Sequence, residues 1–297
     1  MNRTIRLIIF TIVVNLCISC KQKHTEINYP TIDYLTVKKK LDTLNVNFNH
    51  SGYNPTVTVL KHENKQIVFF GASHVRGIDH PQFKALEEAF MKQKPQIAFN
   101  EGGQVAETEH YATRDSAILK DGETGLAKFL CDKTKISLLN GDMSADEEFA
   151  GLLGKFPREQ VYLYLGIERF LQPFSQGFVG EVPIDTAFQK SFIAYLDKYN
   201  FKPTTQERDL SYLYKLYFQY FKKKVDLKNL IPVHEYYLLD TGIFGKIGRT
   251  SKDIRDQALL KKIDDALDKY DRVFVVFGAS HWMAVQPALK FIIEKKR

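Results

Sequence analysis

The sequence Gly-Ala-Ser-His occurs twice in the chain, and its two histidines are the residues best suited to chemistry. Residues 68–74 read Val-Phe-Phe-Gly-Ala-Ser-His and residues 275–281 read Val-Val-Phe-Gly-Ala-Ser-His, so each copy ends an apolar run. Neutral imidazole is a common metal ligand and titrates near neutral pH, so His74 and His281 could bind a metal ion or transfer protons. A single histidine at a strand end is often only a structural hydrogen-bond donor; the repeat favours a functional pair. We expect each glycine to let the backbone turn sharply.

Two acidic residues follow two other predicted strands. Glu101 lies in Asn-Glu-Gly-Gly directly after the apolar residues 97–99, and Asp142 ends Asn-Gly-Asp after residues 136–139. The carboxyl ends of the strands in an open α/β sheet meet at one edge, so we expect both acids near the histidines. The alternative for each acid is an exposed turn, of which these sequences are also typical.

Two histidines with one or two carboxylates form the ligand set of hydrolytic Zn²⁺, Mn²⁺ or Fe²⁺ sites, where the metal lowers the pKa of bound water. We predict that His74, Glu101 and His281 bind a divalent metal ion (Mn, Zn, Fe or Co), with Glu101 or Asp142 as general base. Arg255, in a predicted helix before the last strand, would stabilise an oxyanion or bind a substrate carboxylate, unless it pairs with Asp256 or another surface acid. The same groups could hydrolyse an ester without a metal.

Other residues carry weaker signals. Ser73 and Ser280 precede the histidines, but a sequence neighbour at a strand end points elsewhere, so a serine-hydrolase triad is not favoured. His80 could join the site, and Cys131 is expected in the core. A stripe of aromatic residues could line an apolar-substrate or haem pocket, although its helical spacing is more typical of a core; it comprises Tyr195, Tyr199, Tyr212, Tyr214, Tyr217, Phe218, Tyr220 and Phe221.

The composition is that of a globular protein. Of the 297 residues, 44% are hydrophobic and 13% aromatic, which excludes a disordered chain. Three cysteines, two of them within the first twenty residues, cannot build a disulfide framework, so stability must come from a core. The formal net charge is +7, but the lysines are spread along the chain without a recognised motif, so no nucleic-acid partner is expected.

The N-terminus predicts attachment to a membrane through a lipid. Residues 1–19 combine Arg3 and Arg6 with a short apolar run, which is typical of a secretory signal peptide. Cys20 follows Ser19 and precedes polar residues, as in bacterial lipoproteins, so we predict that Cys20 is lipidated in the cell envelope, at the outer membrane or its periplasmic face. Ordinary cleavage with a soluble product is the alternative, because Cys17 stands where such signals usually have leucine. Residues 20–34 are interpreted as a tether.

Residues 35–297 are expected to form one α/β domain with a mostly parallel central sheet, because strand and helix patterns alternate. The two Gly-x-x-His strand ends should meet at one cleft. A helical insertion is expected at about 144–224, where long aromatic-rich helical patterns replace the strands. The expected strands are 56–60, 66–70, 97–99, 136–139 and 272–277, and the main expected helices are 81–94, 125–133, 161–174, 185–199, 206–223, 252–270 and 279–293.

The two Gly-Ala-Ser-His copies, Glu101 and the helix with Arg255 together resemble the TraB, GumN and Tiki superfamily, with its erythromycin-esterase and ChaN-like haem-uptake lipoprotein branches. The resemblance spans nearly the whole mature chain, although each motif is short. It implies an α/β fold with two Gly-x-x-His half-sites facing one cleft, and a hydrolytic activity. That activity is metal-dependent peptidase in Tiki-like members and esterase in the erythromycin branch. It also implies that His74, Glu101 and His281 form the core of the site.

The expected function is therefore a lipid-anchored envelope hydrolase of amide or ester bonds in a peptide, ester or other small substrate. A haem- or ligand-binding lipoprotein without turnover, a metal-free esterase and a catalytically silent relative remain alternatives. The chain departs from the superfamily pattern in Trp282-Met283-Ala284 after the second histidine and in the insertion, so no branch supplies the substrate.

Overall fold

The computed structural model describes residues 28–43, 56–75, 77–103, 105–177, 180–228, 230 and 242–296. The predicted signal peptide and the lipidated Cys20 lie outside these residues. Within the described part of the chain, none of the helices is both long enough and apolar enough to cross a membrane.

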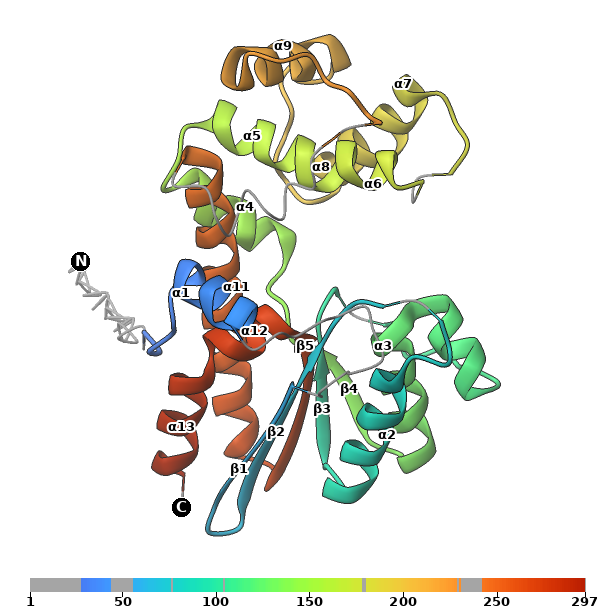
Figure 1. Cartoon of the computed structure of the whole chain (residues 1–297), viewed down its shortest axis with the longest axis vertical. Coiled ribbons are helices and arrows are strands. Elements are labelled where there is room, and N and C mark those ends of the chain that lie inside the picture. Colours follow the sequence, from blue (N-terminus) through green and yellow to red (C-terminus); the bar gives the residue numbers. More distant parts are fainter. Residues whose placement is uncertain are drawn as a thin grey trace, which may run out of the picture.

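A five-stranded sheet of order β1-β2-β5-β3-β4 forms the centre of the fold (Figure 1). Strand β1 runs antiparallel to β2, and the pairs β2–β5, β5–β3 and β3–β4 are parallel. The predicted α/β fold with a mostly parallel sheet is confirmed. The strands are β1 (Thr56–His62), β2 (Lys65–Ala72), β3 (Ile97–Asn100), β4 (Ser137–Asn140) and β5 (Arg272–Gly278).

The two strands that carry the repeat lie side by side. Their register places Gly71 opposite Phe277 and Ala72 opposite Gly278, so the two copies are offset by one residue. Both strands are buried on both faces, which is why each reads as an almost continuous apolar run. This parallel pairing brings the two histidines to the same edge of the sheet, as expected.

Helices cover both faces of the sheet. Helices α2 (Pro81–Gln93) and α3 (Arg114–Thr134) share a core with one face, and α13 (Gln286–Lys295) and the end of α11 (Ile243–Leu267) share a core with the other. Helix α3 is longer than the expected 125–133 because two helical segments join across a kink at Gly122, whose φ is 56°. The expected 279–293 helix is two helices, α12 (Ala279–Ala284) and α13, with proline in the first turn of α13.

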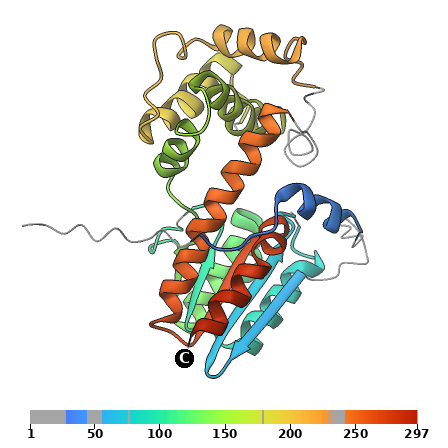
Figure 2. The same cartoon turned by 90° about the vertical axis from the view of Figure 1, so that its left-hand side faces the viewer.

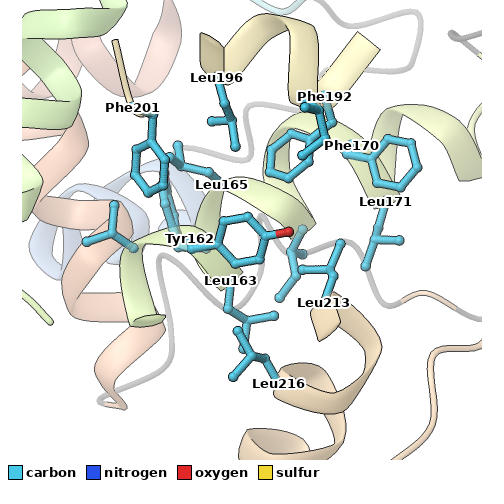
Figure 3. Packing of buried hydrophobic residues seen from close by; sticks show 14 of the residues in the cluster. Tyr162, Leu163, Leu165, Phe170, Leu171, Phe192, Leu196, Phe201, Leu213 and Leu216 are labelled. Carbon is cyan, nitrogen blue, oxygen red and sulfur yellow. The ribbon is translucent and has the colours of Figure 1, made fainter. Parts of the chain in front are cut away.

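The expected helical insertion is present and has its own apolar core. Figure 3 shows Tyr162 within this core, among residues that include Phe170, Phe192 and Leu213. Aromatic rings pack edge to face or tilted there, and the Tyr162 hydroxyl donates to the Glu207 carbonyl at 2.6 Å. The insertion comprises α4 (Ala145–Leu153), α5 (Arg158–Gly166), the π-helical turn η1 (Ile167–Leu171), α6 (Gln172–Ser175), α7 (Ile184–Ala187), the π-helical turn η2 (Phe188–Ile193), α8 (Ala194–Lys198) and α9 (Leu210–Phe221).

Helix α11 connects the insertion to the sheet (Figure 2). Its first turns supply Phe244 and Ile247 to the core of the insertion, and its later turns supply Leu259 and Ile263 to the core under the sheet. The helix begins at Ile243, nine residues before the expected start at residue 252, because residues that pack in the insertion core extend its apolar face.

The N-terminal helix α1 (Tyr34–Thr43) packs on α12. Tyr29 and Tyr34, which fall in the segment interpreted as a tether, are buried at 5% and 3% exposure. The Tyr29 backbone N–H donates to Gln257 on α11 at 2.8 Å, and the Tyr29 carbonyl accepts from the same side chain at 3.0 Å. From Tyr29 onward this segment is therefore part of the folded domain.

Candidate active site

A cleft of about 1680 Å³ lies at the carboxyl edge of the sheet, and the insertion contributes to its wall. All five residues predicted from the sequence line this cleft: His74, Glu101, Asp142, Arg255 and His281. They come from the loops after β2, β3 and β4, from α11 and from α12. The prediction that strand ends bring these side chains together thus agrees with the structure, and Arg255 joins them from a helix.

Glu101 is the central group. One carboxylate oxygen, Oε2, accepts the backbone N–H of Gly278 at 2.6 Å, and the other, Oε1, accepts from Arg255 at 2.9 Å. Burial by itself would raise the pKa of Glu101, but the charges of His281, Arg255 and His74 outweigh it, so the pKa of this carboxyl is lowered. Glu101 therefore remains ionised.

His281 is buried, with 1% of its surface exposed. Its Nδ1 lies 2.6 Å from Asp256 Oδ1 and 2.9 Å from the Tyr34 hydroxyl, and that hydroxyl also donates to Asp256 at 2.7 Å. Its Nε2 lies 3.4 Å from Glu101 Oε1 and forms no hydrogen bond with a described residue. The carboxylate on Nδ1 fixes the ring so that Nε2 faces Glu101.

His74 faces Glu101 from the other copy of the motif. Its Nδ1 lies 2.5 Å from Glu123 on α3, and its Nε2 lies 3.9 Å from Glu101 Oε2. Its side chain is 62% exposed, in contrast to buried His281. The hydrogen bond to Glu123 is the main reason that the pKa of His74 is raised to about 9, with the nearby Glu101 charge adding to it. Each histidine is thus oriented by its own carboxylate toward the same central carboxylate.

The repeated glycines serve close packing. Gly278 lies at the junction of β5 and α12 with an ordinary backbone conformation, φ −55° and ψ 145°, so the change of direction at this copy does not require a glycine. A Cβ at position 278 would lie 3.1 Å from Glu101 Oε2 and from His74 Nε2. A Cβ at Gly71 would press on the Thr56 hydroxyl and lie 3.0 Å from the Trp282 Cβ. Both positions lack room for a Cβ atom, and at position 278 this lets the backbone N–H approach Glu101 closely enough for a hydrogen bond.

Arg255 and Asp142 form a bidentate pair. Arg255 Nε donates to Asp142 Oδ1 at 2.7 Å, and Nη2 donates to Oδ2 at 2.9 Å as well as to Glu101. Asp142 Oδ2 also accepts the backbone N–H of Gly102 at 2.9 Å. Both oxygens of Asp142 are occupied, so this residue positions Arg255 and the loop after β3. Arg255 pairs with these two acids of the site and not with a surface acid.

Sequence reasoning missed the partners of the histidines. Glu123 was not singled out, although it follows Gly122, at the kink of α3. Asp256 carried no spacing signal, because its contact with His281 depends on the rotation of α11. Tyr34 stood at the end of the interpreted tether. Lys252, one turn before Arg255, also lines the cleft.

The remaining candidates lie outside the catalytic groups or have structural roles. The His80 ring accepts the Gln82 backbone N–H at 3.2 Å and caps α2. Cys131 is a free, buried core residue, as expected. The hydroxyls of Ser73 and Ser280 form no hydrogen bond with a histidine among the described residues. Most of the aromatic stripe packs against the insertion core, with Tyr195 and Tyr199 also at the cleft.

The side chains of His74, His281 and Glu101 are the candidate ligands for a metal ion. Among the described residues, no three histidine, cysteine or carboxylate side chains are grouped closely enough to hold one as they stand. The donor types do fit a divalent cation: two Nε2 atoms face one ionised carboxylate, and a second carboxylate orients each ring through Nδ1, as in histidine–metal sites. The buried Nε2 of His281 has no hydrogen-bond partner in the part of the chain that the structure describes, which is the observation that most favours a ligand there.

Comparison of the chain with protein-family models, with curated proteins and with solved structures found no match.

Proposed function

We propose that this protein is a hydrolase of ester or amide bonds, held at the bacterial cell envelope by a lipid on Cys20. The observation that carries the proposal is the arrangement of two histidine–carboxylate pairs, His74–Glu123 and His281–Asp256, around one ionised carboxylate in a large cleft. Two imidazoles oriented toward one carboxylate are suited to activating water. Such a cluster of ionisable groups in a cleft is typical of a functional site. It agrees with what the resemblance to the TraB, GumN and Tiki superfamily implies.

In this proposal His74, His281 and Glu101 hold a divalent cation, which would supply a water of lowered pKa as the nucleophile. Glu101 suits a ligand better than a general base, because its pKa is lowered by the surrounding cations. Asp142 has both oxygens bound, so it positions Arg255 and does not take the proton. The Nη1 atom of Arg255 forms no hydrogen bond with a described residue and can stabilise the oxyanion of the substrate.

A metal-free hydrolase is the second candidate, and the His74–Glu123 pair favours it. His74 is the more exposed of the two histidines, and its Nδ1 is held by Glu123 at 2.5 Å, as a general base is held in a histidine–carboxylate dyad. Because the pKa of His74 is raised to about 9, this reaction needs alkaline pH, where neutral His74 Nε2 accepts the proton of the attacking water and returns it to the leaving group while Arg255 stabilises the oxyanion.

Metal content separates the two candidates. Residues 21–297 should be purified without chelators as wild type, His74→Ala and His281→Ala, with His110→Ala as a surface control that pairs with Asp132. We expect near-stoichiometric Mn, Fe, Co or Zn in the wild type and in the control, and its loss in both site variants. Elemental analysis measures the metal, and circular dichroism checks that the variants are folded.

A wild-type protein that takes up no metal after reloading would rule out the metal site. An ester and peptide screen would then test the metal-free hydrolase. Turnover that survives in folded His74→Ala protein would contradict both forms of the proposal.

A further inference from the structure

We propose that Lys252 forms an anion-binding subsite beside the catalytic groups, so that substrates carry a carboxylate or similar oxyanion close to the bond that is cleaved. This inference rests on the proposed hydrolase function and assigns a substrate class to the same cleft. It makes Lys252 a specificity-determining residue.

The position of Lys252 places it next to the reacting centre. Lys252 and Arg255 are three residues apart on α11, so their side chains lie on the same face of the helix. Both residues line the cleft together with His74 and His281. A group bound by Lys252 would therefore lie about one helical turn from the atoms that Arg255 contacts.

Lys252 has no hydrogen-bond or ion-pair partner among the described residues. Its Nζ lies over the ring of Tyr34, 5.5 Å from the ring centroid. Burial, followed by the charge of Arg255, lowers the pKa of Lys252, which indicates an ammonium group that is poorly solvated. A partly desolvated charge without a partner costs free energy, and an anionic ligand would recover that cost.

The three acids whose charges act on Lys252 are already bound to other groups. Glu101 accepts from Arg255 and from a backbone N–H, and Asp256 holds His281 and accepts from the Tyr34 hydroxyl. Glu168, on the wall of the cleft that the insertion provides, accepts from the Tyr164 hydroxyl. Its Oε2 lies 3.6 Å from Arg169 Nε, and neither of these two atoms forms a hydrogen bond with a described residue. None of the three forms a hydrogen bond with Lys252, so the ammonium is left for a molecule that enters the cleft.

Arg255 adds a second cationic donor to the subsite. Its Nε and Nη2 atoms are used by Asp142 and Glu101, whereas Nη1 forms no hydrogen bond with a described residue. The Nη1 group carries two N–H donors, so one can bind a carboxylate oxygen beside Lys252 while the other stabilises the oxyanion.

The test compares an aryl ester that carries a carboxylate with its neutral methyl-ester counterpart. The proteins are wild type, Lys252→Met, Lys252→Arg and the control Lys261→Met, which alters an exposed lysine of the same helix that pairs with Asp265. We expect Lys252→Met to lower the ratio of kcat/KM for the charged over the neutral ester by about 10- to 100-fold, the range of a charge-assisted hydrogen bond. Lys252→Arg should retain most of this ratio, and Lys261→Met should retain all of it.

A second measurement does not depend on turnover. Calorimetric titration with inorganic phosphate should show binding to the wild type and to Lys261→Met, and weaker binding to Lys252→Met by a similar factor. An unchanged ester ratio, or equal phosphate binding by wild type and Lys252→Met, or no phosphate binding by either, would overturn the subsite. If no ester is cleaved but Lys252→Met loses phosphate, the hydrolase proposal fails and the subsite stands.

Discussion

At the scale of single residues, the ring orientation of each histidine is set by a carboxylate partner. Histidine has two ring nitrogens, and a carboxylate on Nδ1 decides where Nε2 points. Glu123 does this for exposed His74, and Asp256 does it for buried His281. Glu101 between them is kept ionised by the same cations that it binds. The site is therefore a set of mutually dependent ionisable groups, and removing one partner changes the protonation of the others.

The His74–Glu123 pair predicts a pH-dependent contribution to stability. Because the folded-state pKa of His74 is raised to about 9 from an ordinary value near 6.5, the pair stabilises the fold fully below about pH 6.5. The contribution is lost as the pH rises through about 9. In metal-free protein, the free energy of unfolding of wild type should exceed that of Glu123→Gln at pH 6, and the difference should shrink by pH 10. Urea denaturation measures both values, and a difference that stays constant with pH would refute the pairing.

At the scale of elements, the N-terminal helix α1 completes the site. Tyr34, at the start of α1, contacts Asp256 on α11 and His281 on α12, and all three are buried. The backbone N–H of Ile32 donates to the Ala284 carbonyl at 2.8 Å, which fixes the chain just before the helix. The position of His281 thus depends on three elements that meet only in the folded protein.

Tyr34→Phe tests this role, since it keeps the ring and removes one hydroxyl. The Asp256 oxygen that accepts from the hydroxyl would be left buried without its donor, so unfolding should become easier by about 1.5–3 kcal/mol. In the proposed reaction, kcat should fall by a larger factor than KM changes. The substitution disturbs the orientation of the His281 ring and leaves the groups that face the substrate in place.

Tyr212→Phe is the matched control for this variant. The Tyr212 hydroxyl also donates to a carboxylate, Glu159, at 3.1 Å, but at an exposed position outside the cleft, so its loss should cost about 1 kcal/mol or less. Urea denaturation and steady-state kinetics of both variants provide the comparison. Equal effects of the two substitutions would show that Tyr34 is only a packing residue.

At the scale of the whole molecule, the cleft is assembled from the sheet edge, the insertion and α11. The insertion has its own core, and α11 contributes to that core and to the core under the sheet (Figures 2 and 3). The segment that would carry the lipid joins the domain close to the site, because Tyr29 already contacts α11. Cys20 precedes Tyr29 by only nine residues, which span at most about 30 Å when extended. A lipid on Cys20 would therefore hold the cleft near the membrane surface.

Replacing Cys20 tests the anchor. In a bacterial host, wild-type protein should sediment with the membranes, and Cys20→Ala should not incorporate labelled fatty acid and should move to the soluble fraction if it is exported. The physical reason is that two or more acyl chains supply the membrane affinity that this polar segment lacks. Cys17→Ala is the control and should stay with the membranes. Incorporation of labelled fatty acid into Cys20→Ala at the wild-type level would contradict lipidation at this residue.

The sequence by itself determined the sheet and four groups of the site. Apolar runs of strand length that alternate with helical patterns predict a parallel sheet, and polar residues at the carboxyl ends of its strands meet at one edge, where His74, Glu101, Asp142 and His281 line the cleft. Local patterns suffice for this, because the direction of a parallel strand fixes where its next residues lie. The repeat predicted the neighbouring positions of β2 and β5 for the same reason.

Only the tertiary structure decided the partners and the exact geometry. Glu123 meets His74 from 49 residues away, and Tyr34 meets His281 from 247 residues away, through helices whose rotation is set by packing. The same Gly-Ala-Ser-His sequence leads into a loop at His74, with φ 37°, but into helix α12 at His281, because different surroundings pack against each copy. Strand direction is a local property, whereas helix rotation and side-chain pairing depend on the whole core.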